Sequence, residues 1–319
     1  MIDRRTVLRF ASSLAAASGA SLPLSSRADP ASKLLLVHGR AQGGRAPADI
    51  QEEWMATLRS GARAIGKSLS TSVEVAFPYY ADVLDRYAQQ ASIPLTADIQ
   101  ARGEPQNDEF LVFQAQFAEA IRQRAGITDD EVDVEYGANP KPRGPLNWQW
   151  VQAILRAIDK RGGGFNQATL EVFTRDVFIY ATRAGVRDEI DRIVGAQLTE
   201  KPTVVVGHSL GSVVAYNVLR TDRRRLRVPL FVTVGSPLAV RAVRDQFRPL
   251  RSPPVDAWFN AFDTRDVVAL YPLDDANFPV RPVVDNYDKV RNATENRHGI
   301  VGYLNDSEVA GHIVKALKE

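Results

Sequence analysis

The feature that most constrains this chain is an apolar run that ends in Gly-His-Ser-Leu-Gly, residues 207–211. Thr203–Val206 are all β-branched, which predicts a short buried strand, and Ser212–Arg220 has the apolar spacing of a helix. A sharp turn must therefore join strand and helix at Ser209. The two glycines permit a strained backbone and a close approach of its neighbours, a context that exposes the serine hydroxyl. We predict that Ser209 is a nucleophile; a plain strand-to-helix turn is the alternative.

Charge and composition favour an ordinary globular protein without a nucleic-acid partner. The 319 residues suffice for one large domain or two, and 45% of them are hydrophobic. The formal net charge is +2, but residues 1–28 contain four arginines and one aspartate, so the remaining 36 Lys+Arg and 37 Asp+Glu leave a net charge of −1. No basic surface for nucleic acid is indicated. The absence of cysteine excludes disulfides, thiolate metal sites and a cysteine nucleophile.

Residues 1–28 are predicted to be a twin-arginine-type signal peptide. The arginine pair lies in Asp3–Arg9, a weakly apolar run follows over Phe10–Leu24, and Ser26–Ala28 supplies small residues for cleavage. The run is too short and too polar to span a bilayer. We expect export from a bacterial cytoplasm to the periplasm or the exterior. An amphipathic N-terminal helix or an uncleaved anchor is the alternative.

The rest of the chain predicts an α/β fold with a mostly parallel central sheet flanked by helices. Continuous apolar runs are typical of strands buried on both faces, and here they alternate with amphipathic helices. The expected strands are Lys33–Val37, Val73–Phe77, Thr203–Val206, Leu230–Gly235, Ala257–Asp263 and Val280–Asp285, and the expected helices among them are Pro47–Leu69, Val186–Leu198, Ser212–Arg220 and Asp306–Leu317.

The alternation lapses between residues 81 and 184, which we interpret as a large helical cap insertion into a core made of residues 29–80 and 185–319. A second, structurally independent helical unit is the alternative. The aromatic stripes of its helices are expected to face a core. The cap is also a candidate for transient contact with a membrane surface. Its expected helices are Glu109–Ala125, Trp148–Lys160 and Asn166–Thr182, with a linker at Gly137–Pro145.

One motif matches a phosphate-binding pattern but is not expected to bind phosphate. Gly61–Ser68 matches the phosphate-binding pattern Gly-x4-Gly-Lys-Ser, which works only as a loop between a strand and a helix. The residues before it, Glu52–Ser60, have the pattern of a helix. A nucleotide site would require a glycine-rich loop after a strand at this point, so we predict none.

A nucleophilic serine needs a histidine to remove its proton and an acid to orient that histidine. His298 is the best of four histidines, because it lies in a predicted loop past the last strand, where catalytic residues are frequent. His38 ends a strand, His208 belongs to the turn, and His312 lies in a helix. We predict that His298 is the base.

Two aspartates follow the predicted strand at Ala257–Asp263 and compete for the role of the acid. Asp266 comes after a turn and can point back across the sheet, so we prefer it to Asp263, a candidate turn former. A developing oxyanion needs two amide donors. The predicted donors are the amides of Leu210, directly after the nucleophile, and Arg40, in the loop after the first strand.

Together these motifs resemble the serine α/β-hydrolase superfamily, particularly its lipase-like and esterase-like members. The resemblance lies in Leu36–Gly39, the pentapeptide at 207–211, Gly235–Leu238 and the order Ser209, Asp266, His298. It covers roughly residues 33–77 and 186–317. The long insertion before the nucleophile departs from the family, in which caps more often come later.

The resemblance implies hydrolysis of a carboxylic ester, including a lipid ester, through an acyl-serine intermediate. It implies no metal, no cofactor and no obligate protein partner. An amidase, thioesterase or acyltransferase would use the same three residues, and a non-catalytic binding module on the same fold is the alternative of another class.

Overall fold

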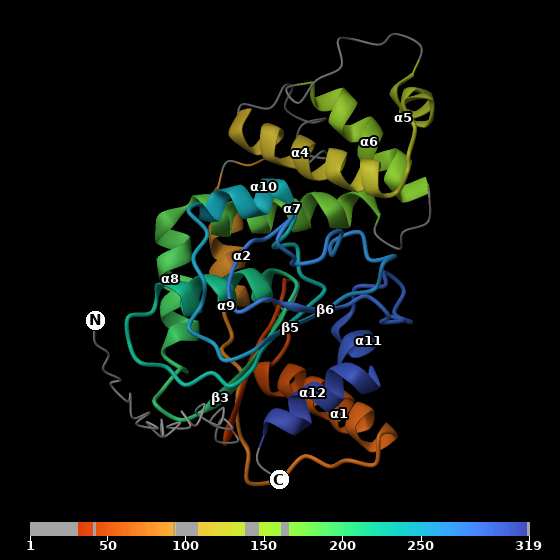
Figure 1. The fold of residues 1–319 in the computed structure, drawn as a ribbon. Coiled ribbons are helices and arrows are strands. Elements are labelled where there is room, and N and C mark those ends of the chain that lie inside the picture. Colours follow the sequence, from red (N-terminus) through yellow and green to blue (C-terminus); the bar gives the residue numbers. More distant parts are fainter. Residues whose placement is uncertain are drawn as a thin grey trace, which may run out of the picture.

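A single six-stranded sheet organises the protein (Figure 1). The structure is a computed structural model that describes residues 31–40, 43–91, 93, 108–137, 147–160 and 166–317. All neighbouring strands pair in parallel, in the order β2-β1-β3-β4-β5-β6, so the molecule belongs to the α/β class. The strands are β1 (Lys33–Val37), β2 (Glu74–Ala76), β3 (Thr203–His208), β4 (Phe231–Val234), β5 (Trp258–Ala261) and β6 (Asp285–Tyr287).

Helices cover both faces of the sheet because successive strand side chains point to opposite faces. Leu34 and Leu36 face one buried apolar cluster with α1, α11 and α12, whereas Leu35 and Val37 face another with α2 and α4–α10. The helices are α1 (Pro47–Ala64), α2 (Ala81–Gln90), α4 (Asp108–Arg124), α5 (Asp129–Tyr136), α6 (Trp148–Lys160), α7 (Gln167–Thr182), α8 (Ala184–Gly195), α9 (Leu210–Thr221), α10 (Arg241–Arg244), α11 (Ile300–Leu304) and α12 (Ser307–Ala316), with a 3₁₀ turn at Asp245–Phe247.

The register of β1 and β3 sets the geometry at the carboxyl edge of the sheet. Leu36 pairs with Val206 and Val37 with Gly207, so the two strands end side by side. The loop after β1 therefore runs directly beside the turn that contains Ser209. A Cβ on Gly39 would lie only 2.9 Å from Cβ of Ser209.

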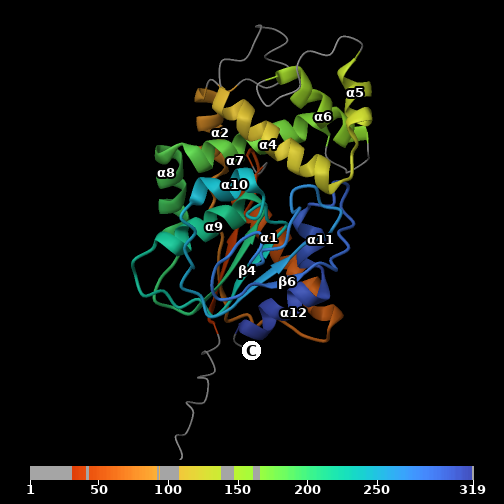
Figure 2. The same cartoon turned by 45° about the horizontal axis from the view of Figure 1, so that its top comes forward.

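In the segment 81–184, helices α4 to α7 lie over the carboxyl edge of the sheet, with α7 between the sheet and the other three (Figure 2). As expected, the aromatic stripes of this segment form a core: Phe113 packs on Phe178, and Phe117 on Phe173, with ring centroids 5.4 and 5.6 Å apart. These side chains belong to the same apolar cluster as Leu35 on the sheet. Within the described residues, no helix has the length and apolar character needed to cross a membrane.

Several predicted boundaries were wrong for identifiable reasons. The last strand is Asp285–Tyr287 rather than Val280–Asp285, because Pro282 lacks the N–H that a ladder requires and Val283 faces solvent. The first helix ends at Ala64 and not at Leu69, since Gly66 adopts a φ of +69°. Sequence patterns also missed α2 and α5. The predicted signal peptide, residues 1–28, and residues 138–145 of the predicted linker lie outside the described residues.

The phosphate-binding pattern at Gly61–Ser68 begins within a helix, as predicted. Gly61–Ala64 is the last turn of α1, and the pattern follows helix rather than a strand. A Cβ on Gly61 would lie 2.6 Å from the carbonyl oxygen of Leu304, so this glycine serves the packing of α1 against the C-terminal helices. Gly61–Ser68 therefore lacks the strand-loop-helix geometry that cradles phosphates.

Gly211 offers a test of this packing. A Cβ there would lie 2.2 Å from the carbonyl oxygen of Val37 and 2.4 Å from that of His38, and backbone atoms cannot move aside cheaply. Gly211→Ala should therefore lower the free energy of unfolding by about 3 kcal/mol, measured by urea denaturation. Gly185→Ala in α8 is the control, because its Cβ meets nothing within 4 Å and should cost nothing. Equal stability of the two variants would contradict the close contact.

Candidate active site

Ser209 lies in a strained turn between β3 and α9. Its φ of +54° and ψ of −129° are unfavourable for any residue with a side chain, at a cost on the order of 1–3 kcal/mol. The turn is held by a hydrogen bond from the Ser209 amide to the carbonyl oxygen of Val234, at 3.1 Å. It also requires glycine at position 207, where a Cβ would lie 2.7 Å from Cα of Ser212. The predicted sharp turn is therefore present, with both glycines in contact with backbone.

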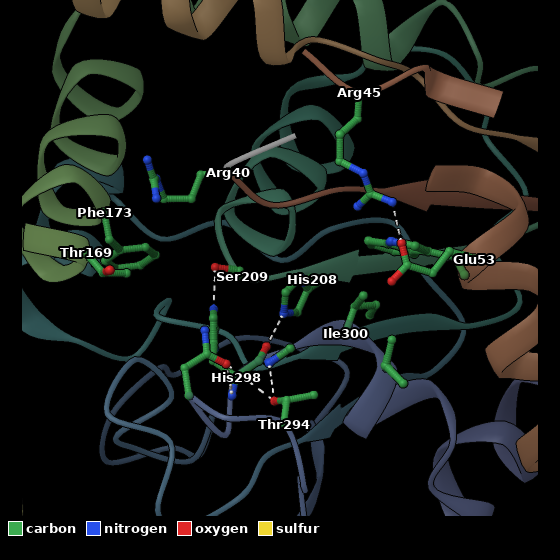
Figure 3. Close-up of a pocket in the computed structure, with 14 residues that line it drawn as sticks. Arg40, Arg45, Glu53, Thr169, Phe173, His208, Ser209, Thr294, His298 and Ile300 are labelled. Carbon is green, nitrogen blue, oxygen red and sulfur yellow. Dashed lines mark hydrogen bonds and ion pairs between the residues drawn. The ribbon is translucent and has the colours of Figure 1, made fainter. Parts of the chain in front are cut away.

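The structure brings Ser209, His298 and Asp266 into one chain of hydrogen bonds. Ser209 Oγ lies 2.7 Å from His298 Nε2 (Figure 3), and His298 Nδ1 lies 2.7 Å from Asp266 Oδ2. A carboxylate can only accept, so Nδ1 carries the proton and Nε2 presents its lone pair to the serine hydroxyl. This tautomer is the one that a general base requires.

Asp266 is buried, and its carboxylate is fully engaged. Oδ2 also accepts a hydrogen bond from the hydroxyl of Tyr303, at 2.5 Å, and Oδ1 accepts one from the Val268 amide, at 2.9 Å. Burial, and then the charge of Asp266, raise the pKa of Tyr303 well above its ordinary value, which keeps that hydroxyl a donor. Three donors compensate the removal of the carboxylate from water.

Asp263, the competing acid, is placed elsewhere. Its carboxylate binds the guanidinium of Arg265, with Nη2 and Oδ2 2.5 Å apart, and accepts a hydrogen bond from the Asn292 amide at 2.8 Å. Asp263 therefore ties β5 to the start of the loop that contains His298, and it makes no hydrogen bond to the histidine ring. Of the two aspartates, the geometry joins Asp266 to His298.

The two predicted oxyanion donors belong to residues near the serine. Leu210 is the first residue of α9, so its amide has no acceptor within the helix and the positive end of the helix dipole lies there. Arg40 follows Gly39 in the loop beside Ser209 and lines the same cavity. These positions suit a developing negative charge on an oxygen near Ser209.

The Arg40 side chain forms an ion pair that sequence reasoning did not anticipate. Its Nε donates to Oδ2 of Asp176 on α7, at 2.7 Å, and the Asp176 side chain is only 4% exposed. The loop after β1 is thereby joined to the helical segment 81–184. A carboxylate in a predicted core helix indicates a basic partner, because a buried charge without a partner would be costly.

The other three histidines occupy structural positions. His38 Nδ1 donates to the carbonyl oxygen of Gly39 at 2.6 Å, and Nε2 accepts from the Tyr80 amide at 3.1 Å. His208 Nε2 lies 2.7 Å from the carbonyl oxygen of His298. His312 lies within α12, as expected, and stacks on Phe259 with ring centroids 3.9 Å apart. Sequence reasoning had assigned none of these contacts.

A cavity of about 330 Å³ opens at Ser209 (Figure 3). Phe173 and Thr169 of α7 form one wall, and the ion pair of Arg45 and Glu53, with Nη2 and Oε2 2.6 Å apart, lies at another. The volume is within the range of about 300–1,000 Å³ that is usual for small-molecule sites. The cavity therefore has room for a small ligand beside the serine hydroxyl.

Among the described residues, no group of three or more His, Cys, Asp or Glu side chains is arranged to hold a metal ion. No protein-family model matches the chain, and a search of curated proteins finds no match. The assignment of a function therefore depends on the geometry of the site itself.

His38 gives the fold a predictable response to pH. Burial lowers its pKa from 6.5 to about 4, because removal from water disfavours the charged ring. In the folded protein Nε2 accepts the hydrogen bond of the Tyr80 amide, which a protonated ring could not do. Between pH 4 and pH 6.5 the unfolded chain binds the proton more readily than the folded protein does. The contribution of His38 to folding stability is therefore fully present above pH 6.5 and is lost as the pH falls toward 4.

We expect His38→Gln, which can still donate and accept at this position, to reduce the loss of unfolding free energy between pH 7 and pH 5 by about 2 kcal/mol. Urea denaturation of both proteins at the two pH values measures the difference. Other titrating groups are present in both proteins, so the wild-type protein serves as the reference for them. One of these groups is Asp191: burial raises its pKa to about 6, which has the opposite effect on stability. The same pH dependence in both proteins would contradict the assignment.

Proposed function

We propose that this protein is a serine hydrolase of the α/β-hydrolase type that cleaves a carboxylic ester. The observation that carries the proposal is the pair of 2.7 Å hydrogen bonds that link Ser209 to His298 and His298 to Asp266. The strained turn, the donor positions at Leu210 and Arg40 and the adjacent cavity support it. In this proposal the helical segment 81–184 acts as a cap that closes one wall of the substrate site.

The mechanism follows from the tautomer of His298. Nε2 accepts the proton of Ser209 as Oγ attacks the ester carbonyl, and the amides of Leu210 and Arg40 stabilise the oxyanion. Asp266 stabilises the resulting imidazolium without taking its proton. His298 then protonates the departing alcohol, which leaves an acyl-serine. Water, activated by the same nitrogen, releases the acid and restores Ser209.

We also propose that the protein is exported through residues 1–28. The support is the arginine pair at positions 4 and 5, the short apolar run and the small residues that follow it. A small-molecule or lipid ester would then meet the enzyme outside the cytoplasm. Fractionation of cells that express the full chain decides this, since exclusive recovery of the uncleaved protein in the cytoplasm would overturn it.

The function is tested by labelling the mature protein with a fluorophosphonate probe, beside a panel of p-nitrophenyl esters of increasing acyl length. Labelling and turnover should both be lost in Ser209→Ala, with kcat reduced by roughly 10⁶-fold, because no other group replaces the nucleophile. Ser68→Ala, at an exposed serine, is the control and should react like the wild type. A folded wild-type protein that neither labels nor hydrolyses any ester would overturn the proposal.

The same assay separates the two aspartates. Asp266→Asn should lower kcat by about 10⁴-fold, because the amide favours the wrong tautomer of His298. Asp263→Asn is the matched control, at an equally buried carboxylate on the same loop, and should retain kcat within about tenfold while losing stability through its contact with Arg265. The reverse order of the two effects would move the acid to Asp263.

A further inference from the structure

The side chain of His208, directly before the nucleophile, points toward the loop that contains the base. Val204, Val206 and His208 alternate on the face of the sheet that α1 and α11 cover, because strand side chains repeat every two residues. The loop that contains His298 precedes α11 and lies on this side. The strand periodicity therefore directs His208 at the backbone of that loop.

Two consecutive side chains hold His298 at two points. His208 Nε2 lies 2.7 Å from the backbone carbonyl oxygen of His298, and Ser209 Oγ lies 2.7 Å from its ring nitrogen (Figure 3). A carbonyl can only accept, so His208 Nε2 carries a proton and donates it. Residues 208 and 209 thus fix both the backbone and the ring of residue 298 relative to the same turn.

The surroundings of His208 keep it neutral and in place. Its ring packs against that of His298, with centroids 4.8 Å apart, and against the edge of Trp54 at 6.0 Å. Burial, then the proximity of His298, lower the pKa of His208 well below its ordinary value. A neutral His208 does not oppose the positive charge that His298 acquires during the reaction.

We propose that His208 is a positioning residue, whose Nε2–H holds the backbone of His298 so that the ring stays within reach of Ser209 Oγ throughout the reaction. This rests on the proposed hydrolase function. The loop itself is locally strained, since Arg297 adopts a φ of +54°, and His298 is the residue that follows it. A hydrogen bond at this carbonyl therefore acts directly beside the strained residue, and it adds a tie to the sheet to the bonds within the loop, such as that from the His298 amide to Asn296 Oδ1 at 3.1 Å.

The matched pair His208→Gln and His208→Met tests the proposal. Gln can place an amide N–H where Nε2–H lies, whereas Met has similar length and no donor. We expect Met to lower kcat and the rate of fluorophosphonate labelling by about 10–100-fold, since a misplacement of about 1 Å costs that much. KM should change less than about threefold, because His208 lines the cavity with only a small part of its side chain and is 8% exposed. Gln should retain kcat within about fivefold.

The outcomes are distinct. A folded Met variant with wild-type kcat, or equal losses in folded Met and Gln variants, overturns the positioning role while the hydrolase function stands. If Met does not fold, Asn replaces it, because its amide is one methylene too short to reach the carbonyl; Asn must then fall below Gln, and equal activity overturns the role. A wild-type protein without activity, or an active Ser209→Ala, overturns the hydrolase function and the inference with it.

Discussion

The strained backbone at Ser209 is the constraint on which the rest of the site depends. A positive φ on a residue with a side chain persists only where its surroundings determine it. Here β1 passes so close to the turn that Gly211 has no room for a Cβ against the backbone of Val37. The tight parallel pairing of β1 and β3 thus holds the serine out of the sheet, and the same pairing places the Arg40 loop beside it.

The residues that face Ser209 come from later strands and are fixed by buried hydrogen bonds. Asp266 follows β5, and its carboxylate is held by Val268 and Tyr303. His298 stands in a loop that Asp263 anchors to β5 through the Asn292 amide. Asp266 and His298 are therefore each positioned by polar contacts with residues that do not themselves react. Preorganised sites require this arrangement.

The sequence was sufficient to predict the α/β class and the location of Ser209, Asp266 and His298, because those depend on local signals: apolar strands, a glycine pair and residues at strand ends. It did not reveal Tyr303, Asp176 or the contacts of His38 with Tyr80. These residues are far in the chain from the groups that they contact. Only Asp176, a carboxylate in a predicted core helix, has a local pattern that indicates a partner. The prediction of a strand at Val280–Asp285 was wrong for the opposite reason. Its apolar residues suggested a strand, but Pro282 prevents one there.

The helical segment 81–184 takes part in the site as well as covering it. Asp176 on α7 is almost fully buried, so its pairing with Arg40 offsets a desolvation cost that either partner alone would leave uncompensated. Phe173 of the same helix packs edge-on toward the ring of His298, with centroids 6.3 Å apart. One helix therefore contacts both the loop of the proposed oxyanion donor and the proposed base. A displacement of α7 would disturb both at once, so in the proposed hydrolase the opening of the cavity and the geometry of the catalytic residues would be coupled.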